Sequence, residues 1–570
     1  MGQPVKNKKK NKKQTQQKKT VQIAANYPVS KWVWISLGVV ILTTFAVYFR
    51  AIGYELLTHW DDKSYVTDNT RIMDFHWANL KLIFSEFYAG NYHPITTFMY
   101  AIEYKLVGTS GTLYHLNNII LHLLNTFLVF VLIRKISPKN AYVALITAAF
   151  FAVHPMHVES VAWVSERKDV LYAFFFLLSL IMYSDYLRSQ KNKYIILSAI
   201  FYILSCLSKP AAVILPLVLF IMDYYANRKY NLKLIIEKLP FLIIALIFGI
   251  IAVKAQGDAI HDTSSVPFIQ HFALVTYSFM SYIIKAIVPV NLSAIYPYPV
   301  EYGSKLPGIY YLSILLVGLL LFFVWYSRKW GKDIIFGFLF FVITIILVLQ
   351  FFRVGGVTMS DRYTYIPYIG IFFIFGKLFE NYTNKVKGKY KKYSNYLLIV
   401  FLLGFALLSA LSYNRVKIWE NDEKLFSDVI KKYPDCGTPY YLLGDHFLGQ
   451  VAVVADSANK ETNLKRSVKE YQNALKCPLN KEDKVKIHFN KGNAEFYLND
   501  FQAAFEDFDK AVKLDPQYYL AIGNRGTARY QLRDYQGALE DYNRAIELNP
   551  QYTDAINNRE NVKLILRIKN

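Results

Sequence analysis

Two adjacent carboxylates, Asp61 and Asp62, follow His59 and Trp60 just beyond the first long apolar segment of the chain. Because neighbouring carboxylates repel each other, one of the two tends to keep its proton or to bind a metal ion or a cationic group. Such a pair suits a general base that removes the proton from a hydroxyl group. The alternative is a solvated acidic turn that caps a helix.

A second charged group, Glu166-Arg167-Lys168-Asp169, follows a short histidine-containing stretch. A buried basic pair at a membrane surface suits a lipid phosphate, so we expect Arg167 and Lys168 to bind one. His154 and His157 precede this group with a spacing that metal sites use, but an isolated pair of histidines is a weak indication of zinc.

Arg362 lies in Asp361-Arg362-Tyr363-Thr364-Tyr365, with Arg353 nearby, at the outer end of another apolar segment. An external arginine runs against the bias of basic residues toward the cytoplasmic side of a membrane, so it needs a specific partner. That partner is either a phosphate or one of the acidic residues.

Polar residues also occur inside the second apolar segment, at His115, Asn118, His122 and Asn125. Spacings of three and four residues put all four on one face of a helix. Polar side chains in a membrane span usually face the interior of the bundle. Hydrogen bonding between helices is the favoured interpretation, and contact with a substrate is the alternative.

The elements that position these residues are membrane helices. Apolar residues make up 54% of the 570-residue chain, aromatic residues 16%, and the mean hydropathy is positive. Apolar runs near the 20 or so residues that cross a bilayer recur up to Tyr413. The sequence therefore predicts an all-α, polytopic membrane bundle over 31–413. Its clear spans are 32–52, 113–133, 141–155, 169–187, 194–208, 211–226, 239–255, 308–327, 334–352, 363–380 and 395–413.

Charge predicts the topology. The net charge of +23 comes largely from eight lysines in the first 20 residues and from short loops between spans, which is the positive-inside pattern and not that of a nucleic-acid-binding protein. We expect residues 1–30 to form a disordered cytoplasmic tail, able to rest on anionic membrane lipid. The lysine-rich loops near 330 and 385–392 are inside only if 271–289 does not cross. This gives eleven spans, external loops at 53–112 and 256–307, and an external C-terminus.

The last part of the chain, 414–570, contains helical repeats. Asp500, Ala504 and Phe508 align with Asp534, Ala538 and Tyr542 at an offset of 34 residues, which is the tetratricopeptide period. Weaker repeats precede these two, and 552–566 is expected to cap the array. Cys436 and Cys477 share this region, and whether they pair is left open. Such arrays bind peptides or proteins.

As an ensemble, the motifs resemble those of the transmembrane and tetratricopeptide repeat-containing O-mannosyltransferases. The motifs are Trp60-Asp61-Asp62 with Asp68-Asn69, Tyr92-His93-Pro94, Tyr114-His115-Leu116-Asn117-Asn118 with His122, His154-Pro155-Met156-His157-Val158-Glu159-Ser160-Val161-Ala162 and Arg362-Tyr363-Thr364-Tyr365-Ile366-Pro367. The similarity covers about 30–570, with spans first and repeats last.

The resemblance implies a GT-C glycosyltransferase fold that moves a hexose, such as mannose, from a polyprenyl phosphate to hydroxyls of an external protein or glycan. It makes Asp61 or Asp62 the base or a metal ligand, which leaves a divalent metal as an open question. The residues expected to bind substrate are His93, His115, His154, Glu159, Arg167, Lys168 and Arg362.

A different class of function remains as the alternative: a non-catalytic membrane scaffold whose repeats recruit partners for envelope assembly. A scaffold has no need of an acidic pair beside a lipid-binding groove, so Asp61 and Asp62 separate the two hypotheses. The Lys-, Asn-, Tyr- and Ile-rich composition is typical of a bacterial protein. We therefore expect an inner-membrane protein with periplasmic repeats, or luminal repeats if the source is eukaryotic.

Overall fold

The computed structural model describes residues 28–257, 267–300, 304–349, 351, 355–385, 391–453 and 456–569. The predictions for the basic tail up to residue 27, for Arg353 and for 386–390 of the lysine-rich loop lie outside these residues. The chain forms two compact units, one from Met1–Leu56 with Asp61–Glu420 and one from Leu57–Trp60 with Asn421–Asn570. We call them the membrane unit and the repeat unit.

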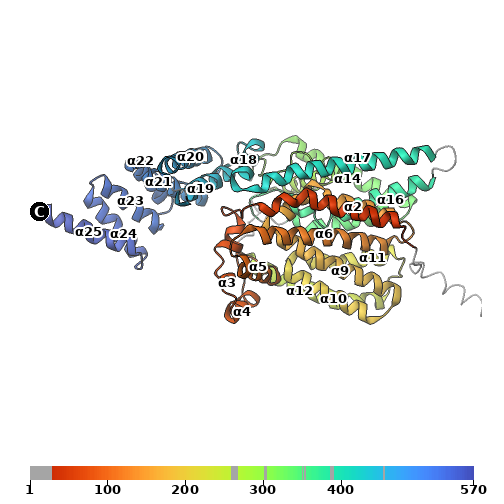
Figure 1. The fold of residues 1–570 in the computed structure, drawn as a ribbon. Helices are drawn as coiled ribbons and strands as arrows, with labels where there is room; N and C mark the ends of the chain where they lie inside the picture. The colour runs from red at the N-terminus through yellow and green to blue at the C-terminus, as the bar shows by residue number, and fades with distance from the viewer. Residues whose placement is uncertain are drawn as a thin grey trace, which may run out of the picture. The chain divides into compact units, whose positions relative to one another are not determined.

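The membrane unit is built from helices that run side by side (Figure 1). Helix α9 packs between α6 and α10, while α7 packs against α2, α6 and α16. The helices are α2 (Lys31–Tyr48), α3 (Thr70–Met73), α4 (Trp77–Ser85), α5 (Pro94–Val107), α6 (Gly111–Ile136), α7 (Ala141–Val153), α8 (Val158–Ala162), α9 (Arg167–Ser189), α10 (Asn192–Ser208), α11 (Leu215–Tyr225), α12 (Leu232–Ala255), α13 (Phe268–Lys285), α14 (Gly308–Ser327), α15 (Asp333–Ile345), α16 (Tyr368–Lys385) and α17 (Lys391–Val416).

Six of the described helical segments are long and apolar enough to cross a membrane, and a bent pair of helices makes a seventh. They are Lys31–Gly53, Gly111–Ile136, Val164–Ser189, Leu232–Ala255, Gly308–Trp330, Tyr396–Glu420 and the pair Ala141–Val153 with Pro155–Ala162. The chain is a multi-pass membrane protein. The other predicted spans fall on three shorter apolar helices, Asn192–Ser208, Pro210–Tyr225 and Asp333–Val348, and on the 18-residue helix α16, so the count of eleven remains a prediction.

The bent pair turns by 57° at His154 and Pro155. Proline lacks the backbone N–H that would continue α7, and it forces the preceding residue into an extended conformation. His154 has φ −76° and ψ 130°, and its Nδ1 accepts a hydrogen bond from the Met156 N–H at 3.3 Å. The chain then resumes in a short 3-10 turn and α8, which brings Glu159 to the start of α9.

The disputed segment 271–289 forms most of α13, which does not qualify as a membrane span by composition. One face is buried, and Thr276 hydrogen-bonds Ser313 of α14 at 2.7 Å. The other face carries the exposed Ile269 and Ile284. This two-sided character fits an interfacial or re-entrant helix, although its place in the bilayer remains a prediction.

The long loop between the first two spans is folded. It carries α3, α4 and α5, which enclose a small core that includes Tyr65, Ile72, Ile83 and Tyr100. The Tyr100 hydroxyl donates to the Val164 carbonyl at 2.8 Å and thereby ties this core to the start of α9. The loop is thus a rigid support for the residues that it carries.

The repeat unit consists of paired helices. They are α18 (Asp422–Lys432), α19 (Gly437–Val453), α20 (Ser457–Leu475), α21 (Lys481–Tyr497), α22 (Phe501–Leu514), α23 (Tyr519–Gln531), α24 (Tyr535–Leu548) and α25 (Thr553–Lys569). Ala504 and Ala538 are fully buried where paired helices touch. A Cβ on Gly492 would lie 2.8 Å from the Phe508 ring, which explains the small residue there. Helix α25 covers the last pair, as the predicted cap should. Cys436 and Cys477 are free thiols.

Candidate functional site

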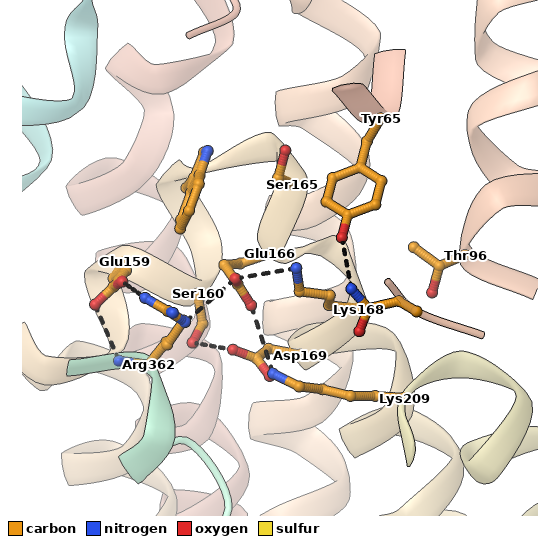
Figure 2. Close-up of polar contacts among 12 residues, drawn as sticks. Tyr65, Thr96, Glu159, Ser160, Ser165, Glu166, Lys168, Asp169, Lys209 and Arg362 are labelled. Atoms are coloured by element: carbon orange, nitrogen blue, oxygen red, sulfur yellow. Dashed lines mark hydrogen bonds and ion pairs between the residues drawn. The ribbon is translucent and has the colours of Figure 1, made fainter. Parts of the chain in front are cut away.

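The site is organised around Glu166, which ends the turn between α8 and α9. Trp163 is extended (ψ 124°) and breaks the helix after Ala162; a 3-10 turn, Val164–Glu166, follows, and the α-helix begins again at Arg167. Glu166 is 1% exposed. Its carboxylate lies 3.3 Å from Lys168 Nζ, 3.5 Å from Lys209 Nζ and 3.3 Å from Arg362 Nε. One carboxylate therefore faces three cations from three parts of the chain, as Figure 2 shows.

Arg362 is held by two glutamates. Its backbone N–H donates to Glu159 Oε2 at 3.1 Å, and Nη1 pairs with Oε1 of the same carboxylate. Glu159 is 1% exposed, whereas the Arg362 side chain keeps 17% of its surface accessible. Of the two partners that the sequence leaves open for Arg362, the structure shows the acidic one.

Lys209 enters the site because Pro210 follows it. The residue before a proline is driven to an extended conformation, and Lys209 has φ −155° and ψ 129° at the end of α10. Its Nζ lies 2.5 Å from Asp169 Oδ1. The Thr96 hydroxyl of α5 donates to the Ser208 carbonyl at 2.9 Å and fixes this turn against the external loop.

Asp61 and Asp62 have different environments. Asp62 is 1% exposed and accepts hydrogen bonds from the Ser165 backbone N–H at 2.8 Å and from the Ser165 hydroxyl. Asp61 is half-buried, and none of the described residues donates a hydrogen bond or forms an ion pair with its carboxylate. Asp62 therefore supports the structure, while Asp61 is available for chemistry.

The Asp61 carboxyl lies in the field of the charged cluster. Burial raises its pKa above the ordinary value, the positive charges of Lys168 and Arg362 oppose the rise, and the negative charge of Glu166 adds to it. A carboxylate with a raised pKa holds a proton more readily, which is the property that a general base needs.

Tyr65 and His93 are the residues of the external loop that border the charged cluster. Lys168 Nζ lies 4.8 Å from the Tyr65 ring, and the His93 ring contacts the same ring edge-on at 5.1 Å. Burial lowers the pKa of His93 to about 3, so the imidazole is neutral. Its Nδ1 hydrogen-bonds the Thr97 hydroxyl at 3.2 Å. His93 thus borders the site as an uncharged group, and its contact with substrate stays a prediction.

Arg167 has a structural role. The guanidinium is completely buried and donates to Glu103 at 2.6 Å, to the Tyr114 carbonyl at 2.6 Å and to Asn118 Oδ1. A fully enclosed guanidinium with these partners has little room for a phosphate. We therefore expect Lys168 and Lys209, and not Arg167, to bind the phosphate.

His115 and His154 also lie in the packing of the bundle. The His115 ring is 2% exposed and faces the Tyr54 ring, with the ring centres 6.3 Å apart. His154 is fully buried, caps a turn through Nδ1 and contacts the rings of Tyr368 and Phe372. Both are left out of the proposed substrate site because neither approaches the charged cluster through a contact of the described residues.

The polar face of α6 makes hydrogen bonds between helices, which was the favoured interpretation. Asn118 donates to the Trp163 carbonyl at 3.0 Å, and Asn125 donates to the Val170 carbonyl at 2.8 Å. His122 Nε2 lies 2.9 Å from the Ala152 carbonyl and Nδ1 lies 2.7 Å from the Tyr365 hydroxyl. A ring nitrogen next to a carbonyl must donate, so Nδ1 accepts from the tyrosine.

Sequence reasoning missed Lys209, and it gave no role to Glu166 and Asp169. A signal for Lys209 was present, because it stands alone between two apolar segments at their external end. The argument that singled out Arg362, a cation on the wrong side for the positive-inside bias, applies equally to Lys209. Glu166 and Asp169 gave no such signal, because their partners lie elsewhere in the sequence.

A metal at the acidic pair finds no support in the donor set. Among the described residues, no third histidine, cysteine or carboxylate converges with Asp61 and Asp62 as metal ligands do. We therefore derive no catalytic step through a metal ion.

Together, the fold and the site define a multi-pass membrane protein with a buried charged cluster at the start of α9 and with tetratricopeptide repeats. The model of the tetratricopeptide repeat matches residues 485–518 and 519–552, which are the helix pairs α21–α22 and α23–α24. The predicted 34-residue repeats are confirmed.

The proteins to which parts of this chain are similar are protein O-mannosyl-transferases. Protein O-mannosyl-transferase F38B6.6 of Caenorhabditis elegans is 24% identical over 399 residues, which cover 68% of this chain and 54% of that protein. Human protein O-mannosyl-transferase TMTC1 is 37% identical over 94 residues, or 16% of this chain and 11% of that protein. The chain is thus similar to protein O-mannosyl-transferases, the class of protein that its motifs resemble.

The match spans about half the length of the worm relative. A solved structure, the first tetratricopeptide domain of Spaghetti (RPAP3) bound to an HSP90 peptide, is 23% identical and covers 22% of this chain and 95% of that chain. Its TM-score of 0.19 is too low to carry an argument.

Proposed function

We propose that this chain is a membrane glycosyltransferase that moves one hexose, such as mannose, from a polyprenyl phosphate to a hydroxyl of an external protein or glycan. The main observation behind the proposal is that one site holds both a carboxylate suited to be a base and a group of cations suited to bind phosphate. Asp61 offers an unpaired carboxylate, and the cations of Lys168, Lys209 and Arg362 lie around Glu166 in the same cluster. The relatedness to protein O-mannosyl-transferases supports the same reaction class.

Asp61 acts as the general base. It takes the proton of the acceptor hydroxyl while the hydroxyl oxygen attacks the anomeric carbon of the sugar. The bond between that carbon and the phosphate oxygen breaks, and its electron pair leaves with the polyprenyl phosphate. A displacement of this kind inverts the anomeric carbon. The raised pKa of Asp61 suits the task, because a base works best with a pKa near the operating pH.

The three cations stabilise the negative charge that develops on the departing phosphate. The Nζ atoms of Lys168 and Lys209 and the Nε atom of Arg362 lie 3.3–3.5 Å from Glu166, beyond the 2.7–2.9 Å or so of a tight charge-assisted hydrogen bond. Lys168 can therefore reorient toward a phosphate at small cost, whereas Lys209 and Arg362 would also have to leave Asp169 and Glu159. The N-terminus of the 23-residue helix α9 adds a positive dipole end.

The domain boundaries and the topology belong to the same proposal. A membrane domain at 31–413 with eleven spans leaves a repeat domain at 414–570 on the external side, where an acceptor protein can bind the repeats. Positive-inside charge supports a cytoplasmic N-terminus. In a bacterium, the protein would lie in the inner membrane with the repeats in the periplasm.

Transfer from purified donors tests the proposal. The wild type in nanodiscs should move a labelled hexose from a polyprenyl phosphate, and Lys209→Met should raise the KM for the donor with a smaller effect on kcat. Loss of one hydrogen bond to a charged group costs about 1.5–3 kcal/mol, or roughly 10- to 150-fold. Lys81→Met, at an exposed position of helix α4 in the external loop 53–112, is the matched control. If the wild type transfers no hexose from any donor, the scaffold hypothesis takes its place.

A further inference from the structure

Three side chains of the repeat unit converge outside the charged cluster. His59 comes from the segment Leu57–Trp60, Asp422 opens α18, and His446 lies on α19. His59 Nδ1 lies 2.8 Å from Asp422 Oδ2, and His446 Nδ1 lies 3.5 Å from the same oxygen. One ligand atom from each residue lies within 4.8 Å of the other two. Among the described residues, no other group of three histidine, cysteine or carboxylate side chains meets this condition.

Two imidazoles and one carboxylate form a donor set that zinc uses. Imidazole nitrogen suits zinc and its first-row neighbours, whereas Ca²⁺ and Mg²⁺ prefer oxygen ligands throughout. Zinc–ligand bonds of about 2.0–2.2 Å in a tetrahedron place the ligand atoms roughly 3.4 Å apart. The His446–Asp422 distance already matches this spacing. The His59 ring, 18% exposed, must move outward by a few tenths of an ångström.

The cluster also holds polar atoms that lack a partner. Asp422 Oδ1 and His446 Nδ1 are both buried, and neither makes a hydrogen bond with the described residues. Leaving a buried polar atom without a hydrogen bond destabilises the fold, so a cation between these atoms would remove a cost that the protein otherwise bears. The side chains of His59 and His446 remain 18% and 12% exposed, which leaves a route for an ion and a position for a water ligand.

The backbone of α19 orients His59. A Cβ at Gly449 would lie 2.7 Å from His59 Nε2, so only glycine lets the ring approach this closely. With Nε2 against the helix, Nδ1 points toward Asp422. The ring planes of His59 and His446 are nearly perpendicular, at 85° with centres 5.3 Å apart, so the two rings are not stacked together.

A second histidine–carboxylate pair in the repeat unit differs from the His59–Asp422–His446 cluster because a lysine also contacts its carboxylate. His488 Nδ1 lies 2.6 Å from Asp507, but the Lys491 ammonium already pairs with the other oxygen of that carboxylate. The protein's own cation thus occupies the place that a metal would take. No lysine or arginine ion pair with Asp422 is present among the described residues.

We propose that His59, Asp422 and His446 bind one Zn²⁺ ion, with water in the remaining position. The ion would tie the segment Leu57–Trp60 to helices α18 and α19 of the repeat unit. This proposal is independent of the transfer reaction, because none of the three residues belongs to the charged cluster.

The test uses the full chain in detergent, stripped of metal with a chelator and freed of any affinity tag. After incubation with Zn²⁺ and desalting, inductively coupled plasma mass spectrometry should find about one zinc ion per chain in the wild type. His446→Ala should weaken zinc binding at least about tenfold, since even the loss of an outer-shell partner costs 10- to 100-fold. His488→Ala is the matched control and should bind zinc like the wild type.

If His446→Ala disturbs the packing, a second variant that should remain folded, Asp422→Asn, tests the same proposal. Asp422→Asn preserves the shape and the hydrogen bond to His59 but removes the charge, and it should also lose zinc. Co²⁺ in place of zinc should give the visible absorption bands of a four-coordinate site in the wild type and not in Asp422→Asn. A wild type without zinc, or equal zinc binding in the wild type and both variants, overturns the proposal and leaves a hydrogen-bonded cluster only.

Discussion

Replacing Asp62 by alanine should destabilise the membrane unit, whereas the same change at Asp61 should not. The Asp62 carboxylate and Ser165 are each 1% exposed, and the carboxylate accepts both the N–H and the hydroxyl of Ser165. Its loss leaves two buried donors without their acceptor. At about 1–3 kcal/mol for each unsatisfied donor, the free energy of unfolding should fall by about 2–6 kcal/mol.

Asp61 provides the matched control, because it is the neighbouring residue and carries the same charge. None of the described residues forms a hydrogen bond or an ion pair with its carboxylate, and burial disfavours its charge. Asp61→Ala should therefore change the stability by less than about 1 kcal/mol. Unfolding of the purified protein by denaturant in detergent measures both variants.

A double-mutant cycle with Ser165→Ala checks the origin of the effect. If the hydroxyl bond is part of the loss, the coupling energy between Asp62→Ala and Ser165→Ala should reach at least about 1 kcal/mol. Additive effects of the two changes, or equal stability of the Asp61 and Asp62 variants, would refute the reasoning.

Three further predictions concern the repeats and the topology. Ala538→Trp should overpack a fully buried contact and cost about 1–3 kcal/mol, seen as faster amide hydrogen exchange in 519–552, whereas unchanged exchange would contradict the repeat register. Burial and the nearby Asp507 raise the pKa of Glu495 to about 7, and this effect outweighs the opposing Lys491 ammonium. The protonated Glu495 carboxyl therefore contributes stability that is fully present below its ordinary pKa and is lost as the pH rises through 7. Glu495→Gln should therefore stabilise the 485–518 repeat relative to wild type at pH 8 but little at pH 5, and a pH-independent difference in hydrogen exchange would speak against this. In a cysteine-free background, a cysteine at Lys385 should resist an impermeant thiol reagent in intact cells while one at Tyr530 reacts, and the reverse would overturn the external placement of the repeats.

The repeats could be predicted from sequence because their signals are local. Asp500 and Asp534 each accept a hydrogen bond from the backbone N–H three residues later, at 3.1 Å and 3.0 Å, and so begin their helices in the same way. The same holds for the apolar segments, since the described part of each of the eleven predicted spans is mostly helical. A run of apolar residues can be recognised without knowing which helices pack against it.

The site could be predicted only in part, because its contacts join distant residues. Asp61 and Asp62 are indistinguishable in sequence, and only Ser165, 103 residues after Asp62, separates their roles. Arg167 carries a charge that suited a phosphate, yet Glu103 pairs with it from 64 residues away. Partners of this kind depend on how helices pack. The positive-inside argument, which depends only on order along the chain, found Arg362 and would have found Lys209.

In the proposed reaction Asp61 is the base and its neighbour Asp62 is not. The direct measurement is single-turnover transfer from a labelled polyprenyl-phosphate hexose by Asp61→Asn, with donor binding measured separately. Asparagine keeps the size and polarity of the side chain but cannot accept the proton. Transfer should fall about 10²- to 10⁴-fold while the protein remains folded and binds the donor as the wild type does. Transfer by Asp61→Asn at the wild-type rate would contradict the account.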